Sequence, residues 1–315
     1  MRNPQPIPQA LSEFGRDMLD CLAYHPHRIA PKYFYDAAGS QLFDRICELP
    51  EYYLTRTELA LYAAHGAEMA ALIGPAAEVI EFGAGSLKKV RLLLQALQAP
   101  RRFVAVDISG AHLQSAAAEL RRDYPELAVD ILVADFSDIA ALPLGAGDGR
   151  RIGFFPGSTI GNFSPPQARR FLSAAARLLA GGGLLIGVDL IKAPHLLNQA
   201  YNDAAGVTAA FNRNLLARAN RELGCDFDLA GFRHHAFYNP GRQRIEMHLM
   251  CAAPQQVSLY GQGFRLHEGD SIHTEDSYKY SIEGFQALAA DCGFAPEAVW
   301  CDPQQLFSVH WLAAP

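Results

Sequence analysis

The stretch Val79–Ser86, VIEFGAGS, joins an apolar run to an acid and two closely spaced glycines. Such an apolar run is typical of a buried strand, and glycine lets the backbone bend tightly and approach a ligand. Residues 88–98 have helical character, so the stretch predicts a strand, a turn and then a helix. Two glycines alone would also fit an ordinary strand–helix turn, because Lys88 stands where a dinucleotide-binding motif has its third glycine.

Apolar strands and helices alternate on both sides of this turn. This alternation predicts a parallel sheet that is covered by helices on both faces. A further helix at 281–292 is followed by two strands with no helix between them. The other expected strands are 102–109, 128–136, 151–159 and 182–191, and the other helices are 111–124 and 165–180.

Three acids lie where strands of this sheet end. Glu81 ends the first strand and suits an ammonium group. Asp107, 22 residues after Gly85, suits the two hydroxyls of a ribose. Asp135 and Phe136 offer an acceptor and a flat apolar face for adenine. Because ligands of open α/β sheets bind at the carboxyl ends of the strands, we expect these side chains in one site.

An adenosine with a zwitterionic tail and no pyrophosphate fits these residues better than a dinucleotide does, and S-adenosylmethionine (SAM) is such a molecule. The two final strands agree, since class I methyltransferases finish their sheet with a reversed strand. Gly83, Gly85 and Lys89 are assigned to the same cofactor site. We therefore predict an α/β protein with a class I, Rossmann-like, SAM-dependent methyltransferase domain.

The pattern changes outside this domain. A helical stretch at about 194–223 precedes alternating segments that predict antiparallel strands, with a turn at Asn239–Gly241. We expect a second, discontinuous α+β module that binds the substrate. The methyltransferase domain is placed at 57–192 and 281–315, and the substrate-binding module at 1–56 and 193–280.

Composition narrows the classes of function. Of the 315 residues, 50% are hydrophobic, which excludes wholesale disorder, and the net charge of −6 argues against nucleic-acid and anionic-membrane surfaces. No apolar run reaches the roughly 18–20 residues of a membrane span, and the N-terminus lacks the apolar segment of a secretion signal. The six cysteines show no CxxC spacing, and His234 and His235 would point to opposite faces of a strand. We expect a cytoplasmic monomer without a metal.

Six segments then resemble the histidine-specific N-alpha-methyltransferases of ergothioneine biosynthesis, the EgtD-like family. They follow that family's order and run from near residue 30 to the end of the chain. They are KYFYDAAGSQLFDRICELPEYYLTRTE (32–58), EFGAGSLKKVRLLL (81–94), FFPGSTIGNFSP (154–165), AYNDAAGVTAAFNRNLL (200–216), RIEMHL (244–249) and TEDSYKYS (274–281).

The resemblance implies a role for each of several residues. It places the substrate carboxylate at Asn162 and at Tyr201, a tyrosine that opens the helix of its segment. It places the imidazole ring at Glu275 and Ser277. It also places the α-amine near Tyr35 and Gly157, with Tyr35 as the catalytic residue. Tyr52 and Met247 are expected to line the pocket.

Some of these residues also have ordinary structural explanations. Asn162 alone would fit a turn or a helix cap, Met247 would fit the core, and HTEDSYK would fit a solvated strand face. Glu275 and Ser277 are two residues apart on an expected strand, so both can face one way.

The resemblance implies SAM-dependent methylation of L-histidine and of its mono- and dimethyl forms, with hercynine as the product of three rounds. Since the chain ends at Pro315 without an oxygenase-like domain, it is not expected to form the C–S bond of ergothioneine. A same-fold enzyme for another amino acid, such as tryptophan or tyrosine, or for a histidine derivative remains an alternative. A non-catalytic module that only binds the cofactor is a second one.

Overall fold

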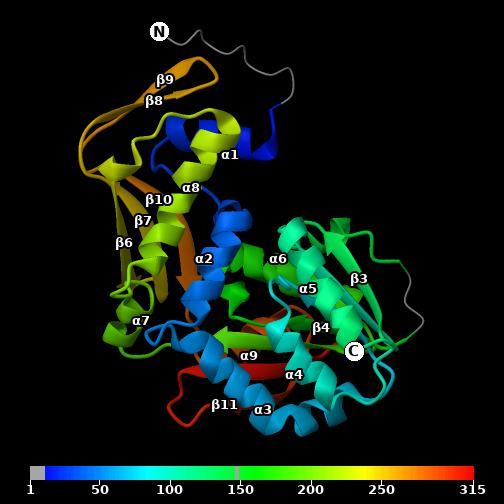
Figure 1. The fold of residues 1–315 in the computed structure, drawn as a ribbon. Coiled ribbons are helices and arrows are strands. Elements are labelled where there is room, and N and C mark those ends of the chain that lie inside the picture. Colours follow the sequence, from blue (N-terminus) through cyan, green and yellow to red (C-terminus); the bar gives the residue numbers. More distant parts are fainter. Residues whose placement is uncertain (1–10, 146–148) are drawn as a thin grey trace. The chain divides into compact units, whose positions relative to one another are not determined.

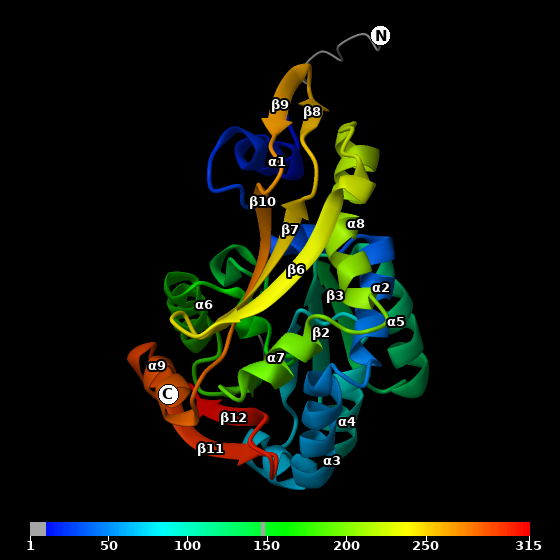
Figure 2. The same cartoon turned by 90° about the vertical axis from the view of Figure 1, so that its left-hand side faces the viewer.

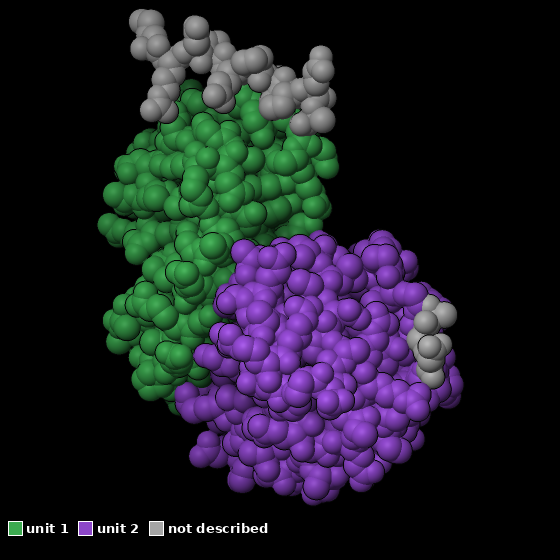
Figure 3. Space-filling model, turned by 45° about the vertical axis from the view of Figure 1, so that its right-hand side comes forward, with its two compact units in different colours: residues 1–52, 194–276 green, residues 53–193, 277–315 purple. Residues whose placement is uncertain are grey.

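The computed structural model describes residues 11–145 and 149–315 and divides into two compact units. Unit 1 comprises Met1–Tyr52 and Pro194–Asp276, and unit 2 comprises Tyr53–Ala193 and Ser277–Pro315 (Figure 3). The junctions expected from the sequence lie after residues 56, 192 and 280. The expectation of no secretion signal concerns the N-terminus, where residues 1–10 lie outside the described residues.

Unit 2 is built on a seven-stranded sheet with the strand order β11-β12-β5-β4-β1-β2-β3. The first five strands along the chain run parallel, whereas β12 is antiparallel to both β5 and β11, which confirms the reversed final strand. The strands are β1 (Glu78–Phe82), β2 (Arg102–Asp107), β3 (Ala128–Val133), β4 (Arg151–Phe155), β5 (Gly183–Asp189), β11 (Ala295–Cys301) and β12 (Phe307–Ala313). The helices are α3 (Tyr53–Ile73), α4 (Lys88–Ala96), α5 (Gly110–Asp123), α6 (Pro165–Leu178) and α9 (Ile282–Asp291), with short 3-10 turns η2 (Ile139–Ala141) and η3 (Thr159–Asn162) (Figure 1).

Helices cover both faces of this sheet, as β5 illustrates. Leu184, Ile186 and Val188 belong to the apolar cluster that α6 and α9 complete. On the opposite face, Gly187 leaves no room for a side chain, because a Cβ there would lie 2.2 Å from Oε1 of Glu58 on α3. The apolar runs of the sequence therefore become strands that are buried from both sides.

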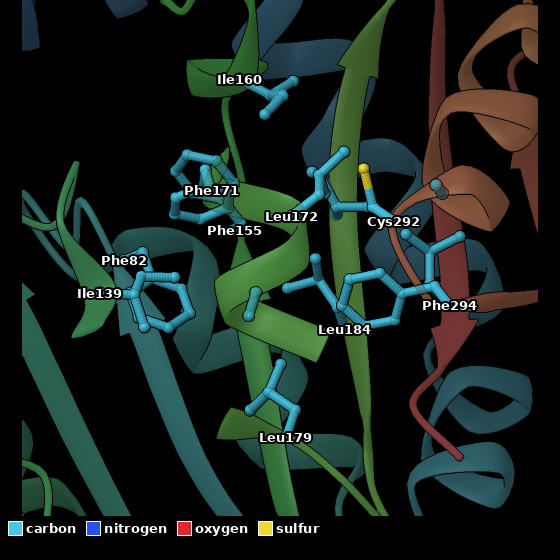
Figure 4. Packing of buried hydrophobic residues seen from close by; sticks show 14 of the residues in the cluster. Phe82, Ile139, Phe155, Ile160, Phe171, Leu172, Leu179, Leu184, Cys292 and Phe294 are labelled. Carbon is cyan, nitrogen blue, oxygen red and sulfur yellow. The ribbon is translucent and has the colours of Figure 1, made fainter. Parts of the chain in front are cut away.

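Phenylalanine rings pack among aliphatic side chains in the core between the sheet and α6 (Figure 4). The rings of Phe155 and Phe171 lie 4.5 Å apart between centroids, and Phe82 meets Phe171 edge-on at 5.6 Å. All three side chains are almost completely buried. This packing holds β1 and β4 side by side and so fixes the turns that follow them.

The strand order reverses at β1, which has β2 on one side and β4 on the other. The loops that leave β1 and β4 then turn to opposite sides of the sheet, and in open α/β sheets this leaves a crevice for a ligand. Asp107 is the last residue of β2, as expected. Asp135 and Phe136 lie just beyond the end of β3 rather than within it.

Unit 1 contains the three-stranded sheet β10-β7-β6, whose strands lie side by side in Figure 2. Its strands are β6 (Phe232–Asn239), β7 (Arg244–Cys251) and β10 (Ser271–Tyr278), with a hairpin of β8 (Gln255–Leu259) and β9 (Gln262–Leu266). The helices of this unit are α1 (Glu13–Ala23), α2 (Ala37–Cys47), α7 (Pro194–Ala200) and α8 (Val207–Leu223), with 3-10 turns η1 (Pro31–Phe34) and η4 (Leu229–Gly231). The turn at Asn239–Gly241 joins β6 to β7, as predicted. The last two residues of β10 belong to unit 2.

The expectation of one continuous helix over 194–223 is wrong, because residues 201–206 form a turn between α7 and α8. Gly206 has a φ of +70°, a left-handed conformation that ends helical continuity. The carboxylate of Asp203 then accepts hydrogen bonds from the backbone N–H groups of Val207 and Thr208, both at 2.8 Å. Tyr201 accordingly lies in this turn and does not open a helix.

Within residues 11–145 and 149–315, no helix combines the length and the apolar character that crossing a bilayer requires.

Candidate active site

The turn after β1 brings its backbone close to an aromatic ring. Gly83 and Gly85 have φ values of +72° and +52°. A Cβ on Gly83 would lie 3.3 Å from two ring carbons of Phe136, so the ring covers this part of the turn. Glycine is needed here for both its conformation and its lack of a side chain.

Asp107 is tied directly to the same turn. Its Oδ2 accepts a hydrogen bond from the backbone N–H of Gly85 at 3.0 Å, and its Oδ1 accepts one from Ser109 at 2.8 Å. The side chain is partly exposed, and each carboxylate oxygen can accept a further bond. Asp107 is therefore oriented to receive two neighbouring hydroxyl groups.

Asp135 and Phe136 lie in the loop that follows β3. Oδ1 of Asp135 accepts a hydrogen bond from the backbone N–H of Ser137 at 2.9 Å. The Phe136 ring packs edge-on against Phe155, with 5.7 Å between centroids, which connects this loop to the core. The loop can thus present one polar acceptor and one rigid apolar face.

Glu81 is a buried carboxyl group that lacks a full set of partners. It is 1% exposed, and its Oε2 has no hydrogen-bond partner among the residues that the structure describes. Burial raises its pKa well above the usual value; Lys89 opposes this shift, and the charges of Asp107 and Glu58 add to it. A ligand with an ammonium group would satisfy this carboxyl, as the zwitterionic tail of SAM requires.

Glu58 is a member of the site that the sequence did not indicate. Its side chain is fully buried on α3, and both carboxylate oxygens accept from the backbone N–H of Gly157 at 2.9 Å. Nζ of Lys89 lies 2.7 Å from its Oε2, and the hydroxyl of Tyr62 donates to its Oε1 at 2.8 Å. Glu58 closes one of the quoted motifs, but only the fold shows that it joins the loop after β4 to the helix after β1.

The loop after β4 carries Gly157 and Asn162 and has a constrained shape. Gly157 has a φ of +80°, and a Cβ there would lie 3.0 Å from Nζ of Lys89. Ser158 also adopts a left-handed conformation, and its Oγ accepts a hydrogen bond from the backbone N–H of Asp189 at 2.9 Å. These contacts fix the turn that presents Asn162.

Asn162 is available to a ligand. Its side chain is partly buried, and its amide forms no hydrogen bond with any residue in the described part of the chain. The preceding residue, Gly161, lies against β10, because a Cβ on it would be 2.8 Å from the carbonyl oxygen of Tyr278 and 3.5 Å from Oγ of Ser277. Within unit 2, the structure therefore brings the residue before Asn162 close to Ser277.

Unit 1 brings two of the predicted tyrosines against Phe43, and a third against one of those two. Tyr35 and Tyr52 meet the Phe43 ring edge-on at 5.7 and 6.4 Å, and Tyr52 meets Tyr201 at 6.2 Å. Burial raises the pKa of the Tyr52 hydroxyl well above its usual value, and the nearby Tyr201, Tyr35 and Glu275 shift it further in the same direction. The predicted substrate residues of unit 1 therefore lie close together.

Glu275 and Met247 lie on the neighbouring strands β10 and β7. Both are buried, at 9% and 1% exposure, so the segment HTEDSYK is not a solvated face. Thr274 ties the two strands together, because its hydroxyl donates to the carbonyl oxygen of Met247 at 3.1 Å. Glu275 and Ser277 are two residues apart on β10, and their side chains therefore point to the same face of this strand.

A group with metal-ligand chemistry also occurs in unit 1. The potential ligand atoms of Glu246, His248 and His273 lie within 4.8 Å of one another. The guanidinium of Arg244 lies 2.7 Å from Glu246 and 2.9 Å from Asp276, and the two histidine rings stack at 4.6 Å. Because Arg244 pairs with both carboxylates and Arg28 also pairs with Asp276, the surroundings favour an ion-pair network over a bound cation.

Comparisons of the sequence with known proteins identify a family and several relatives. The model of the family "Histidine-specific methyltransferase, SAM-dependent" matches residues 14–314. The histidine N-alpha-methyltransferase of Mycolicibacterium smegmatis is 42% identical over 301 residues, which are 93% of this chain and 92% of that protein. The ergothioneine biosynthesis protein 1 of Neurospora crassa is 32% identical over 91% of this chain, which spans 33% of that longer protein.

Among solved structures, a magnesium protoporphyrin IX methyltransferase from Synechocystis PCC 6803 is similar with a TM-score of 0.47 and 13% identity. The match covers 90% of this chain and 95% of that one.

Proposed function

Since the chain belongs to the family of SAM-dependent, histidine-specific methyltransferases, we propose that it methylates the α-amine of L-histidine. Three rounds convert histidine, through its mono- and dimethyl forms, into hercynine. This is the first step of ergothioneine biosynthesis, and the similarity to an ergothioneine biosynthesis protein supports the assignment.

The residues around the β1 turn suit SAM. Asp107 would accept the ribose hydroxyls, and Asp135 and Phe136 would hold the adenine ring. The buried carboxyl of Glu81 would meet the ammonium of the methionine tail, and Lys89 would meet its carboxylate. Gly83 and Gly85 allow the tight turn, and the space beside Gly85 is open, because a Cβ there would meet no atom within 4 Å.

The observation that best supports histidine as the substrate is the pair of polar residues Glu275 and Ser277 on β10. Glu275 and Ser277 are both buried and share one face of the strand, so a charged acceptor and a hydroxyl point the same way. An imidazole ring carries one N–H and one bare nitrogen and can use both groups. Asn162 and Tyr201 would bind the substrate carboxylate, Tyr35 and Gly157 would contact the α-amine, and Tyr52 and Met247 would line the pocket.

Methyl transfer requires a neutral amine, because an ammonium has no lone pair. When bound, SAM supplies an electrophilic methyl group on a positively charged sulfur. The amine nitrogen forms the new N–C bond as the S–C bond breaks, and the sulfur keeps the electron pair of that bond. In the first two rounds the methylated ammonium then loses a proton, and Tyr35 would guide its departure. The residues chiefly position the amine in line with the S–CH3 bond.

Two alternatives are less well supported. A same-fold enzyme for tryptophan or tyrosine would have to place a larger ring beside Glu275 and Ser277, and indole has an N–H donor but no acceptor nitrogen. A non-catalytic module that merely keeps the cofactor fold predicts damaged cofactor positions, whereas Gly83, Gly85, Asp107 and Asp135 are all present.

We also propose a cytoplasmic monomer that binds neither nucleic acid nor membrane. The net charge of −6 supports the absence of a nucleic-acid surface. The scattered spacing of the six cysteines, without a CxxC motif, supports a reducing compartment. Light scattering of the purified protein tests the monomer.

The substrate is tested by incubating the purified protein with SAM and a mixture of all protein amino acids. Mass spectrometry should show histidine carrying one, two and finally three methyl groups, and no other amino acid should gain mass. Methylation of another amino acid at an equal or higher rate would contradict the proposal.

A further inference from the structure

One buried carboxylate in unit 2 forms ion pairs with the ammonium groups of two lysines. Asp189 is the last residue of β5. Its Oδ1 lies 2.5 Å from Nζ of Lys192, and its Oδ2 lies 2.7 Å from Nζ of Lys279. The hydroxyl of Tyr53 also donates to this carboxylate, at 2.8 Å. The side chains of Asp189 and Lys279 are fully buried, and that of Lys192 is 5% exposed.

Asp189 faces two ammonium groups at once. Burial opposes the ionisation of Asp189, but the two ammonium groups hold its pKa below the usual range. Burial lowers the pKa of Lys192 to about 8, and the charge of Lys279 contributes to this shift while Asp189 opposes it. Because buried charge is costly to maintain, two lysines on one aspartate call for an explanation beyond stability.

Among the residues that the structure describes, only Lys279 of the two lysines contacts a proposed substrate residue. Nζ of Lys279 donates a hydrogen bond to Oγ of Ser277 at 2.8 Å. The contacts of Lys192 are with Tyr53, Asp189 and the carbonyl oxygen of Leu190.

The backbone fixes Lys279 in this position. The backbone N–H of Tyr280 donates to the carbonyl oxygen of Asp189 at 3.1 Å, and that of Ile191 donates to the carbonyl oxygen of Tyr280 at 3.0 Å. The chain after Ser277 is therefore bonded to the end of β5, and Lys279 points at Asp189.

The chemistry of the two groups sets the direction of the hydrogen bond. An ammonium has three donors and no acceptor, whereas a serine hydroxyl has one donor and two acceptor lone pairs. Ser277 must therefore accept from Lys279, and its own O–H must point away from that ammonium.

We propose that Lys279 is a positioning residue that turns Ser277 into a hydrogen-bond donor toward the substrate ring, so that the site selects the neutral imidazole of histidine. The inference rests on the proposed function, in which Glu275 accepts from the ring N–H. Ser277 then donates to the bare ring nitrogen. An imidazolium has no bare nitrogen, and it would bring a second positive charge toward the buried ammonium of Lys279.

A double-mutant cycle tests the coupling between the two residues. Ser277→Ala and Lys279→Met should each raise KM for histidine about tenfold, as expected for one hydrogen bond, with little change in kcat. The double variant should be no worse than Ser277→Ala alone. Lys192→Met is the matched control, because it removes the other ammonium from Asp189, and it should change KM by less than about twofold.

The pH dependence of KM for histidine is a second measurement, and it should not change if Lys279 only supports the fold. Free imidazole titrates near pH 6.5, so KM of the wild type should rise steeply between pH 7.5 and pH 5.5. In Lys279→Met the rise should be several-fold smaller, because the imidazolium is no longer repelled. Lys279→Gln keeps an uncharged donor toward Ser277. It should restore KM at pH 7.5 but keep the weaker pH dependence.

The outcomes separate the inference from the proposed function. If Ser277→Ala leaves KM for histidine unchanged, the placement of the imidazole is wrong and the inference falls with it. If Ser277→Ala raises KM but the double variant raises KM about a hundredfold, the product of the two single effects, only the role of Lys279 is overturned. Equal effects of Lys192→Met and Lys279→Met would also overturn it. SAM affinity, measured by calorimetry, verifies that each variant is folded, and Lys279→Gln replaces Lys279→Met if the latter does not fold.

Discussion

Two buried carboxyl groups of unit 2 have very different surroundings. Glu58 receives hydrogen bonds from the Gly157 backbone and the Tyr62 hydroxyl and an ion pair from Lys89. Glu81 has an oxygen with no donor among the described residues, and burial raises its pKa. Glu58 therefore stabilises the shape of the site, whereas Glu81 gains a partner when an ammonium group binds.

Asp107 provides the prediction for the cofactor. Replacing Asp107 with alanine should weaken SAM binding by about 1.5–3 kcal/mol, the usual cost of losing hydrogen bonds to a charged group. Calorimetry measures the change in affinity. Asp130→Ala is the control, since Asp130 lies on neighbouring β3 and pairs at the surface with Arg102. Equal affinity in folded Asp107→Ala and wild type would contradict the assignment.

Glu275 provides the prediction for specificity. A site built around a hydrogen bond rejects analogues without the donor by roughly 10⁴-fold. Glu275→Ala should therefore reduce kcat/KM for histidine steeply, because the ring N–H loses its charged acceptor. It should cost phenylalanine and tryptophan little, because phenylalanine has no donor for the carboxylate and the larger indole gains the volume that the substitution frees beside Met247.

The measurement is kcat/KM for these three amino acids in wild type and variant. A loss by the same factor for all three would mean that Glu275 supports the fold or the cofactor site. The placement of the imidazole would then be wrong.

At the level of elements, the break between α7 and α8 positions a proposed substrate residue. Tyr201 lies in the turn, and the ring of His234 hydrogen-bonds its carbonyl oxygen through Nε2 at 2.8 Å. Asp203, two residues later, binds the first N–H groups of α8. One short turn therefore both starts a helix and presents a tyrosine.

Removal of the Asp203 carboxylate, which caps the start of α8, should destabilise this helix. Asp203→Ala leaves two helix N–H groups without their acceptor, and we expect a loss of about 1–2 kcal/mol in the free energy of unfolding. Denaturant titration measures it. Ser281→Ala is the control, because Ser281 caps α9 through a single exposed hydrogen bond to the N–H of Gly284, and it should cost less. If Ser281→Ala lowers the free energy of unfolding as much or more, the prediction that the buried cap at Asp203 contributes more is wrong.

At the scale of the whole molecule, the sheet of unit 2 places an ionisable group in its interior. His310 lies on β12, the antiparallel strand next to β5, and its side chain is fully buried. Its Nε2 lies 2.9 Å from Oγ of Ser308, and its Nδ1 has no partner among the described residues. Burial lowers the pKa of His310 from 6.5 to about 4, so the ring is neutral in the folded state at neutral pH.

This group should make folding sensitive to acid. Between pH 6.5 and about 4 the unfolded chain binds a proton at His310 that the folded chain does not, so stability falls as pH falls through this window. The loss attributable to His310 is on the order of 2–3 kcal/mol between pH 7 and pH 4.5.

Denaturant titrations at the two pH values measure it as the difference between wild type and His310→Gln. His195→Gln, at an exposed position on α7, should leave the pH dependence unchanged. The same acid sensitivity in wild type and His310→Gln would refute the prediction.

The sequence predicted the sheet of unit 2 and one edge of its site from local signals. Apolar runs separated by helices can be buried only in a covered parallel sheet, and the carboxyl ends of parallel strands meet at one edge. Asp107 and the glycine turn could therefore be placed together before the fold was known, and Gly85 does donate to Asp107. The roles in substrate binding came from the resemblance of motifs, and they stay predictions.

Only the tertiary structure decided which polar residues are buried and what they bind. The segment HTEDSYK would fit a solvated strand from its composition, yet Asp276 is buried because Arg244 and Arg28 neutralise it. Glu58 and Lys279 likewise find their partners far along the chain, at Gly157 and Asp189. A polar side chain is stable inside a protein only when such partners reach it, and local sequence does not encode where distant partners will lie.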